Sequence, residues 1–489
     1  MGEKCPTGIK GLDDILTGGF PAKRLYLIQG APGVGKTTLA LQFLLEGAAR
    51  GERGLYISLS ETRDELKAVA DSHGWNLEAF AILDLSAIEE VLSESKENTF
   101  FHPSELELSK TTQLLLDHVE KVQPQRIVLD SLSEFRLLAE SALRYRRQML
   151  RLKQYFAGRN STVLLLDDQT GDASDLHIQS IAHGVITLER LSVSYGIERR
   201  QLRIQKLRGV KFREGAHDYR LERGGMQLFP RLVAAEHKKN FEEIPASSGI
   251  AGFDLLMGGG LDRGTSALFI GPAGCGKSTV ALQHAAAAAS RGERAEVFIF
   301  DEGEKTLAKR AAAIGISLSE YVAKGLIRIQ QIDPAELSPG EFTAIIRRNV
   351  EERGSSMVII DSLNGYLNAM PDEKFLSLQL HELLTFLNQQ GVVSIMTLAQ
   401  HGLIGNMQSP VDVTYLADTV ILLRYFETGG KLRKAISVVK KRSGHHEDTI
   451  RELSFDSTGI NIGPPLDKFH GVLTGVPVPV QNRDLQRLP

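Results

Sequence analysis

Two glycine-rich segments of the chain have the residue types and spacing of loops that hold nucleotide phosphates. Residues 30–37 read Gly-Ala-Pro-Gly-Val-Gly-Lys-Thr, and residues 271–278 read Gly-Pro-Ala-Gly-Cys-Gly-Lys-Ser. Both match G-x-x-x-x-G-K-[ST], a pattern in which glycines let consecutive backbone N–H groups turn toward phosphate oxygens. The helix that follows adds the partial positive charge of its N-terminus. The two segments therefore predict two sites for a nucleoside triphosphate.

Each loop also supplies side chains for a magnesium–ATP complex. Lys36 and Lys277 are expected to reach the β and γ phosphates, while the hydroxyls of Thr37 and Ser278 hold Mg²⁺. Cys275, inside the second loop, is interpreted as a small filler side chain rather than a redox centre. The predicted ATP-binding residues are Gly30, Gly33, Gly35, Lys36, Thr37, Thr38, Gly271, Gly274, Gly276, Lys277, Ser278 and Thr279.

A magnesium ion bound to ATP also takes an acidic partner from the end of a neighbouring buried strand. An apolar run over residues 127–129 ends in Asp130, and a matching run over residues 358–360 ends in Asp361. Both lie downstream of a phosphate loop, so they are candidate Walker-B residues. The predicted metal ligands are Thr37, Asp130, Ser278 and Asp361.

Hydrolysis further requires a base that polarises the attacking water. The apolar run after the first helix of each repeat is followed by Glu61 in one case and by Asp301 and Glu302 in the other. Glu61 and Glu302 are the leading candidates for the base, and Asp301 is a second candidate in the second site. A carboxylate at this position can instead cap the next helix. Gln169 and Gln400, which follow later strands, are candidate sensors of the γ phosphate.

The motifs occur twice because the chain is a tandem repeat. A shift of 241 residues aligns Arg-Gly-Glu-Arg at 50–53 with the identical segment at 291–294, and a shift of 231 aligns residues 130–132 with 361–363. Drifts of this size are what loop insertions produce, so we predict two homologous domains. The predicted parts are a first domain over residues 1–240, a second over 241–463 and a C-terminal tail over 464–489.

Each repeat alternates short apolar runs with longer amphipathic segments. The runs of the first repeat lie at residues 25–28, 55–57, 127–129 and 163–166, separated by stretches of helical spacing. Short continuous apolar runs between helices indicate strands of a mainly parallel sheet that is covered on both faces. The predicted fold class is α/β, formed twice.

The composition narrows the class of protein further. The 489 residues carry 57 Lys and Arg against 60 Asp and Glu, a net charge of −3. This charge gives no whole-chain reason to expect binding to nucleic acid or to anionic membranes. Two cysteines cannot form a disulfide framework, and we find neither a signal peptide nor an apolar run long enough to span a membrane. We therefore expect a cytoplasmic protein.

The segment over residues 7–13 with Gly18 and Gly19, the phosphate loop and the strand end at residues 60–62 together resemble the RecA-like ATPases of the KaiC clock-protein family. The resemblance covers both repeats. It implies two tandem RecA-like P-loop domains, ATP and Mg²⁺ as ligands, and a homo-hexamer of two rings with nucleotide at the subunit boundaries. It does not identify a regulatory or signalling partner.

The same resemblance suggests a role for two basic elements. Lys206-x-Arg208 in the first repeat and Lys440-x-Arg442 in the second are similar to a Lys-x-Arg element that, in this family, reaches the γ phosphate held by the neighbouring subunit. A cation supplied in this way stabilises charge on the transferring phosphoryl group. The alternative is a basic strand exposed to solvent.

The family also contains an autokinase that phosphorylates neighbouring Ser and Thr residues of its second ring. These positions correspond here to Thr414 and Tyr415. Thr414 keeps a transferable hydroxyl and is the candidate phosphoacceptor. Tyr415 does not keep the chemistry of the second acceptor, so ordered phosphorylation of two sites is not expected.

The leading hypothesis is thus a hexameric KaiC-like ATPase with serine/threonine autokinase activity in its second domain, acting in signalling or circadian-type timing. One alternative is a RecA-like ATPase that depends on nucleic acid. Another is a slow, ATP-bound scaffold without kinase activity.

Overall fold

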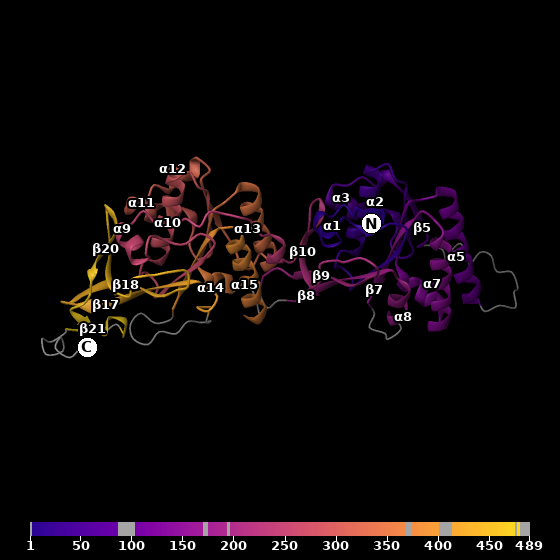
Figure 1. Ribbon diagram of the computed structural model, residues 1–489. Coiled ribbons are helices and arrows are strands. Elements are labelled where there is room, and N and C mark those ends of the chain that lie inside the picture. Colours follow the sequence, from indigo (N-terminus) through magenta and orange to yellow (C-terminus); the bar gives the residue numbers. More distant parts are fainter. Residues whose placement is uncertain are drawn as a thin grey trace. The chain divides into compact units, whose positions relative to one another are not determined.

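The computed structural model forms two compact units (Figure 1). The first comprises Met1–Ser194 and Glu198–Arg231, and the second comprises Tyr195–Ile197 and Leu232–Pro489. Each contains one nine-stranded sheet. The structure describes residues 2–86, 103–169, 175–192, 196–367, 373–400, 413–474 and 477–479.

The sheet of the first unit has the strand order β11-β10-β9-β8-β3-β7-β6-β4-β5. The strands from β8 to β5 in this order run parallel, and β9, β10 and β11 extend the sheet with antiparallel pairs. These strands are β3 (Leu25–Gly30), β4 (Gly54–Ser58), β5 (Ala81–Asp84), β6 (Arg126–Asp130), β7 (Thr162–Asp168), β8 (Gly184–Leu191), β9 (Arg199–Leu207), β10 (Ala216–Glu222) and β11 (Gly225–Phe229). A separate small sheet pairs β1 (Lys4–Cys5) with β2 (Phe20–Pro21).

Helices cover both faces of this sheet. Side chains of a strand alternate between the two faces, so a strand that is apolar throughout places apolar side chains on both of them. Along β3, Leu25 and Leu27 join one apolar cluster, and Tyr26 and Ile28 join another. The first cluster takes in residues of α6 and α7, and the second takes in residues of α2. The helices are α1 (Lys10–Ile15), α2 (Lys36–Ala49), α3 (Arg63–His73), α5 (Pro103–Val122), α6 (Leu132–Ala139), α7 (Ala142–Ala157) and α8 (Asp175–Ile181), with a 3₁₀ turn at Leu77–Ala79.

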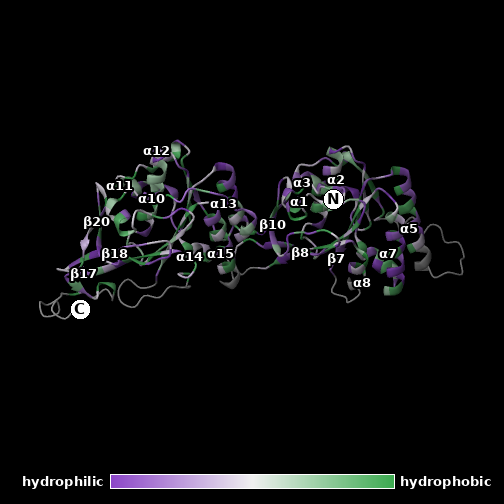
Figure 2. Cartoon of the chain, in the orientation of Figure 1, coloured by the Kyte–Doolittle hydropathy of each residue, from purple (hydrophilic) through white to green (hydrophobic). Residues whose placement is uncertain are grey.

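Helix α7 illustrates how the outer layer forms. Its buried side chains include Tyr145, Met149, Leu152 and Phe156, which recur every three or four residues and so lie on one face. The intervening residues are mostly polar or charged. Figure 2 shows the resulting mixture of hydrophilic and hydrophobic residues along α5 and α7.

The second unit repeats the design, with the strand order β14-β13-β15-β16-β12-β17-β18-β19-β20. The strands are β12 (Ser266–Gly271), β13 (Ala295–Ile299), β14 (Ile327–Gln331), β15 (Met357–Asp361), β16 (Val393–Ala399), β17 (Thr419–Thr428), β18 (Lys431–Lys441), β19 (Arg451–Asp456) and β20 (Gly459–Pro465). The helices are α9 (Ala251–Leu256), α10 (Lys277–Ser290), α11 (Glu304–Ala313), α12 (Leu318–Ala323), α13 (Pro339–Arg353), α14 (Leu363–Leu367) and α15 (Glu373–Gln389), with 3₁₀ turns at Ala234–Glu236 and Val472–Thr474.

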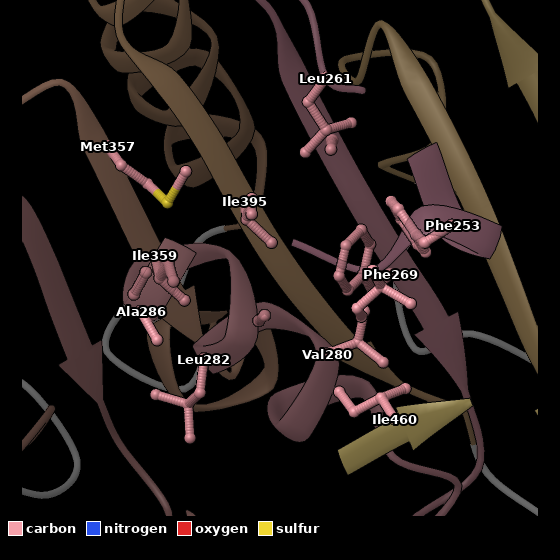
Figure 3. Packing of buried hydrophobic residues seen from close by; sticks show 14 of the residues in the cluster. Phe253, Leu261, Phe269, Val280, Leu282, Ala286, Met357, Ile359, Ile395 and Ile460 are labelled. Carbon is pink, nitrogen blue, oxygen red and sulfur yellow. The ribbon is translucent and has the colours of Figure 1, made fainter. Parts of the chain in front are cut away.

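The core of the second unit lies between α10 and the sheet. Phe269 of β12, Ile359 of β15 and Ile395 of β16 belong to one buried cluster with Val280, Leu282 and Ala286 of α10 (Figure 3). A second apolar cluster, which includes residues of α13 and α15, covers the opposite face. Two mainly parallel sheets with helices on both faces confirm the predicted pair of RecA-like α/β domains.

The stretch predicted as a tail contains ordered elements. Strand β20 ends at Pro465, and β21 (Phe469–His470) pairs with β22 (Val478–Pro479). Val472 is buried against Phe426 and Ala435 of the main sheet. Within the described residues, no helix combines the length and apolar character needed to cross a membrane.

Candidate nucleotide sites

The two phosphate loops leave the carboxyl ends of central parallel strands and lead directly into helices. In the first unit α2 begins at Lys36, and the preceding Gly35 has φ of 98°. A side chain there would be strained, and its Cβ would lie 2.9 Å from the Leu221 side chain. Gly276 before α10 has φ of 106°, and a Cβ there would lie 2.2 Å from the Phe455 ring. The turn that aims each helix N-terminus therefore needs glycine.

The loop lysines curl back over the loops. Lys36 Nζ donates hydrogen bonds to the carbonyls of Gly30 at 2.8 Å and Ala31 at 3.1 Å. Lys277 Nζ makes the two matching bonds at 2.8 and 2.7 Å. Both side chains are only 7% exposed, and burial lowers the pKa of Lys277. Each amine is thus held at the loop rather than in solvent.

Each predicted pair of metal ligands comes together. Thr37 Oγ1 lies 3.4 Å from Asp130 Oδ2, and Ser278 Oγ donates to Asp361 Oδ1 at 2.9 Å. Burial raises the pKa of both aspartates. A hydroxyl beside a carboxylate is an oxygen donor set of the kind that Mg²⁺ prefers together with substrate phosphates. The residues present therefore fit the ion.

The two aspartates are oriented by residues that sequence reasoning missed. Tyr56 of β4 donates its hydroxyl to Asp130 Oδ2 at 2.5 Å, whereas Thr397 of β16 donates to Asp361 Oδ1 at 2.5 Å. The two partners come from different strands, so comparing the repeats would not have revealed them. The only signal in the sequence is a polar atom inside an otherwise apolar buried strand.

Glu61 has the environment of a base held ready for a proton. Its Oε2 is buried and has no hydrogen-bond partner among the described residues. Burial, followed by the nearby charge of Asp130, raises its pKa to about 7. The cap of α3 is formed by Thr62 and Glu65, which bond to each other's backbone N–H groups. Glu61 is therefore not the capping residue of the next helix.

The carboxylates of the second site, by contrast, are engaged. Arg310 of α11 bonds to Glu302 through Nη2–Oε2 at 2.6 Å and Nε–Oε1 at 3.3 Å. Its Nη1 donates to Thr279 Oγ1 at 2.9 Å. Asp301 Oδ2 accepts a 2.5 Å hydrogen bond from Ser362. Sequence reasoning missed Arg310, although aligning the repeats places it opposite Val69 and would have drawn attention to it.

A further acidic residue distinguishes the first site. Asp168 Oδ1 lies 2.6 Å from Lys36 Nζ. Asp168 pairs with Gly30 at the end of β7, and the matching partner of Gly271 is Ala399. The second site thus lacks this carboxylate. A signal was available, because Asp168 is the second residue after the strand predicted at residues 163–166.

The basic element of the first unit lies at the opposite end of the sheet from its own phosphate loop. Lys206 Nζ donates to the Gln179 carbonyl at 2.5 Å, and Arg208 Nη2 to the Ser180 carbonyl at 2.8 Å. These residues lie beside the start of β8, which pairs with the start of β3. The loop follows the end of β3, so the length of that strand, roughly 15 Å, separates the two.

The second unit repeats this arrangement. Lys440 Nζ donates to the carbonyls of Ala417 at 2.7 Å and Thr414 at 3.0 Å, and Arg442 Nη2 donates to the Tyr415 carbonyl at 2.9 Å. The turn that holds Thr414 precedes β17, whose first residues pair with the start of β12. The structure thus does not bring Thr414 or the basic element to the phosphate loop of the same domain.

Comparison with known proteins agrees with this geometry. The model of the KaiC ATPase family matches residues 5–233 and again residues 246–467, which is most of the chain. The chain belongs to the KaiC family. Both of its domains are KaiC-type ATPase domains, as the resemblance implied.

Curated relatives from the family align over nearly the whole length. The circadian clock protein KaiC3 of Synechocystis sp. is 26% identical over 99% of this chain and 97% of the relative. The circadian clock oscillator protein KaiC of Thermostichus vulcanus is 26% identical over 97% of this chain and 92% of its own length. KaiC2 of Synechocystis sp. is 27% identical over 96% and 83%, respectively.

Proposed function

We propose that the protein is a cytoplasmic, ATP-hydrolysing regulator that works as a homo-hexamer. The observation that carries this proposal is Glu61, a half-buried residue whose buried Oε2 lacks a hydrogen-bond partner among the described residues. It follows the strand next to the one that ends in Asp130. Such a group accepts a proton near neutral pH, as a hydrolytic base must.

In hydrolysis, the oxygen of a water molecule bonds to the γ phosphorus while Glu61 takes one of its protons. The bond between the γ phosphorus and the bridging oxygen breaks, and ADP leaves. Lys36 supports the charge on the phosphates, and Glu302 is the corresponding base of the second site. Thr37 with Asp130, and Ser278 with Asp361, would hold Mg²⁺, which neutralises phosphate charge when bound.

The basic elements are proposed to act on nucleotide held by the adjacent subunit. Each lies at the far end of the sheet from its own loop, which favours action between subunits. Arg208, Lys23 and Lys153 line one cavity of about 260 Å³ in the first unit. This concentration of positive charge suits a phosphate chain. A closed ring brings the two ends of the sheet together across each boundary.

The second domain is proposed to transfer a γ phosphoryl group to Thr414. The hydroxyl oxygen of Thr414 would bond to the γ phosphorus, its proton passing to Glu302 and ADP leaving. Because Thr414 lies far from the loop of its own domain, the donor must be ATP of a neighbouring subunit. The relatives named above are clock proteins, which favours a role in timing or signalling with a partner that senses these states.

Glutamine at both candidate bases tests the hydrolytic part. We expect Glu61→Gln combined with Glu302→Gln to reduce phosphate release at least a hundredfold while nucleotide binding persists. Unchanged turnover would contradict the assignment of the bases. Wild-type protein that binds ATP without releasing phosphate would instead be a scaffold.

Intact mass after hours with Mg-ATP tests the kinase part. We expect a gain of about 80 Da that is absent in Thr414→Ala. A wild-type chain that releases phosphate but gains no mass would limit the function to hydrolysis.

A further inference from the structure

The two sites differ in what faces the candidate base. The matching positions eight residues downstream are Val69 for Glu61 and Arg310 for Glu302. Valine has no hydrogen-bonding group, so the first base has no cation at this place. In the second site the guanidinium contacts both carboxylate oxygens.

The contact to Glu302 has a specific geometry. Two parallel N–H···O bonds between a guanidinium and a carboxylate are stronger than single neutral hydrogen bonds and fix the carboxylate plane. The third bond of Arg310, to Thr279, ties the guanidinium to the second residue after Lys277 in α10. Arg310 is therefore fixed from two sides, although its side chain is 34% exposed.

In the first site no hydrogen-bonded side chain among the described residues links Thr38 to Glu61, as Arg310 links Thr279 to Glu302. Thr38, the counterpart of Thr279, lies 3.4 Å from His73 Nε2, and the other nitrogen of that ring lies 2.7 Å from the carbonyl of Glu222. The His73 imidazole of α3 contacts the backbone of β10 and makes no hydrogen bond to Glu61. The difference between the sites is thus built from side chains of α3 and α11.

We propose that Arg310 is a positioning residue that restrains Glu302 and so slows water activation in the second site. The proposal rests on the proposed function, because it assumes that Glu302 is the base. The two bonds to one guanidinium hold the plane of the Glu302 carboxylate, so turning this carboxylate toward an attacking water costs these bonds. Arg310 also donates to the hydroxyl of Thr279, one of the predicted ATP-binding residues, so KM for ATP is measured beside kcat to separate an effect on binding from an effect on the base.

The test removes the Arg310 side chain in protein whose first site has been inactivated. Phosphate release is measured in full-length Glu61→Gln protein, with and without Arg310→Val, which installs the residue found at position 69. We expect kcat to rise about tenfold and to change more than KM for ATP; the rise is smaller than the roughly hundredfold or more of general-base catalysis because Arg310 restrains the base and does not replace it. Arg310→Lys, which keeps the charge but not the paired bonds, should fall between the two.

Lys309→Val is the matched control, because Lys309 is an exposed cation on the same helix. It should leave kcat unchanged. An unchanged or lower kcat in Arg310→Val overturns the proposal, as does an equal rise in the Lys309 control. If turnover persists in Glu61→Gln with Glu302→Gln, the assignment of the bases fails instead. Turnover that requires Glu302 but ignores Arg310 contradicts the restraint alone.

Discussion

At the scale of single residues, the chemistry of the first site depends on the charges that surround Glu61. Three carboxylates, those of Asp130, Glu65 and Asp168, raise its pKa in addition to burial, and Lys36 lowers it. The outcome is a pKa of about 7. Only the ionised carboxylate accepts a proton from water, so activity should lie on the alkaline side of this value.

We therefore expect a pH profile with a single acid limb. In Glu302→Gln protein, where hydrolysis depends on the first site, kcat/KM should fall as the pH is lowered through about 7. Below the pKa the fall should approach tenfold per pH unit, since kcat/KM reports the free enzyme. Phosphate release between pH 5.5 and 8.5 provides the measurement, with ATP affinity determined at each pH as the control. A flat profile would falsify the role of Glu61.

The motif residues could be predicted because their spacing along the chain is local. Lys36 and Thr37 are adjacent within one loop, and Asp130 ends an apolar run, so sequence alone indicated the contact that the structure brings together. Asp168 and Arg310 are different, because each contacts a segment far away in sequence: Asp168 contacts Lys36, and Arg310 contacts Thr279. No local pattern shows that such contacts form, although a comparison of the two repeats would have revealed the substitutions.

At the scale of elements, α2 packs on β6 around a buried arginine. Arg126 is fully buried, pairs with Glu52 at 2.5 Å and donates to the carbonyls of Pro6 and Phe43 at 2.7 Å each. Gly47 of α2 leaves room for it: a Cβ at Gly47 would lie 2.4 Å from Arg126 Cδ. A buried ion pair tolerates such an intrusion poorly, because the arginine has nowhere to move.

The second unit has uncharged residues at the positions that correspond to Gly47 and Arg126. Ala288 and Met357 occupy the positions of Gly47 and Arg126, and Met357 lies in the apolar core (Figure 3). We expect Gly47→Ala to destabilise the first unit by about 1–3 kcal/mol through overpacking, although alanine favours helix. The double variant Gly47→Ala with Arg126→Met should lose less free energy of unfolding than the sum of the two single variants, because methionine in place of Arg126 removes the overlap with the alanine side chain.

Urea unfolding followed by tryptophan fluorescence measures this, since Trp75, the single tryptophan, reports on the first unit. Gly158→Ala is the control, because a Cβ at that helix end meets no atom within 4 Å. Strict additivity of the two core changes, or a stabilising effect of Gly47→Ala alone, would contradict the proposed packing.

Fold prediction succeeded for elements whose two faces are both buried. The runs at residues 25–28, 127–129 and 163–166 became central parallel strands, since continuous apolar sequence has few other uses between helices. Strand β9 was harder, because only Leu202, Ile204 and Leu207 are buried among its exposed or half-buried residues. Its pattern resembles an exposed basic segment until the sheet places it beside β8.

At the scale of the whole molecule, the proposed function needs more than one chain. Each domain carries a phosphate loop at one end of its sheet and a Lys-x-Arg element at the other. In the proposed function neither end completes the site by itself, because the loop lysine and the added cation stabilise the developing charge together. The sequence indicated this only through the family resemblance, since no spacing within a chain encodes a contact between copies.

Mixing two inactive variants tests whether the cation comes from a neighbour. In a Glu302→Gln background, Lys36→Ala and Arg208→Ala should each lose first-site turnover, by about a hundredfold or more for the arginine. An Arg208→Ala subunit keeps an intact phosphate loop, and a Lys36→Ala subunit keeps an intact Arg208. After equal amounts of the two variants have exchanged subunits, about a quarter of the head-to-tail boundaries combine the intact loop with the intact arginine. Turnover should therefore recover to roughly that share of the parent value. If arginine and loop act within one chain, the mixture will stay as inactive as its parts, whereas recovery requires a site shared between subunits.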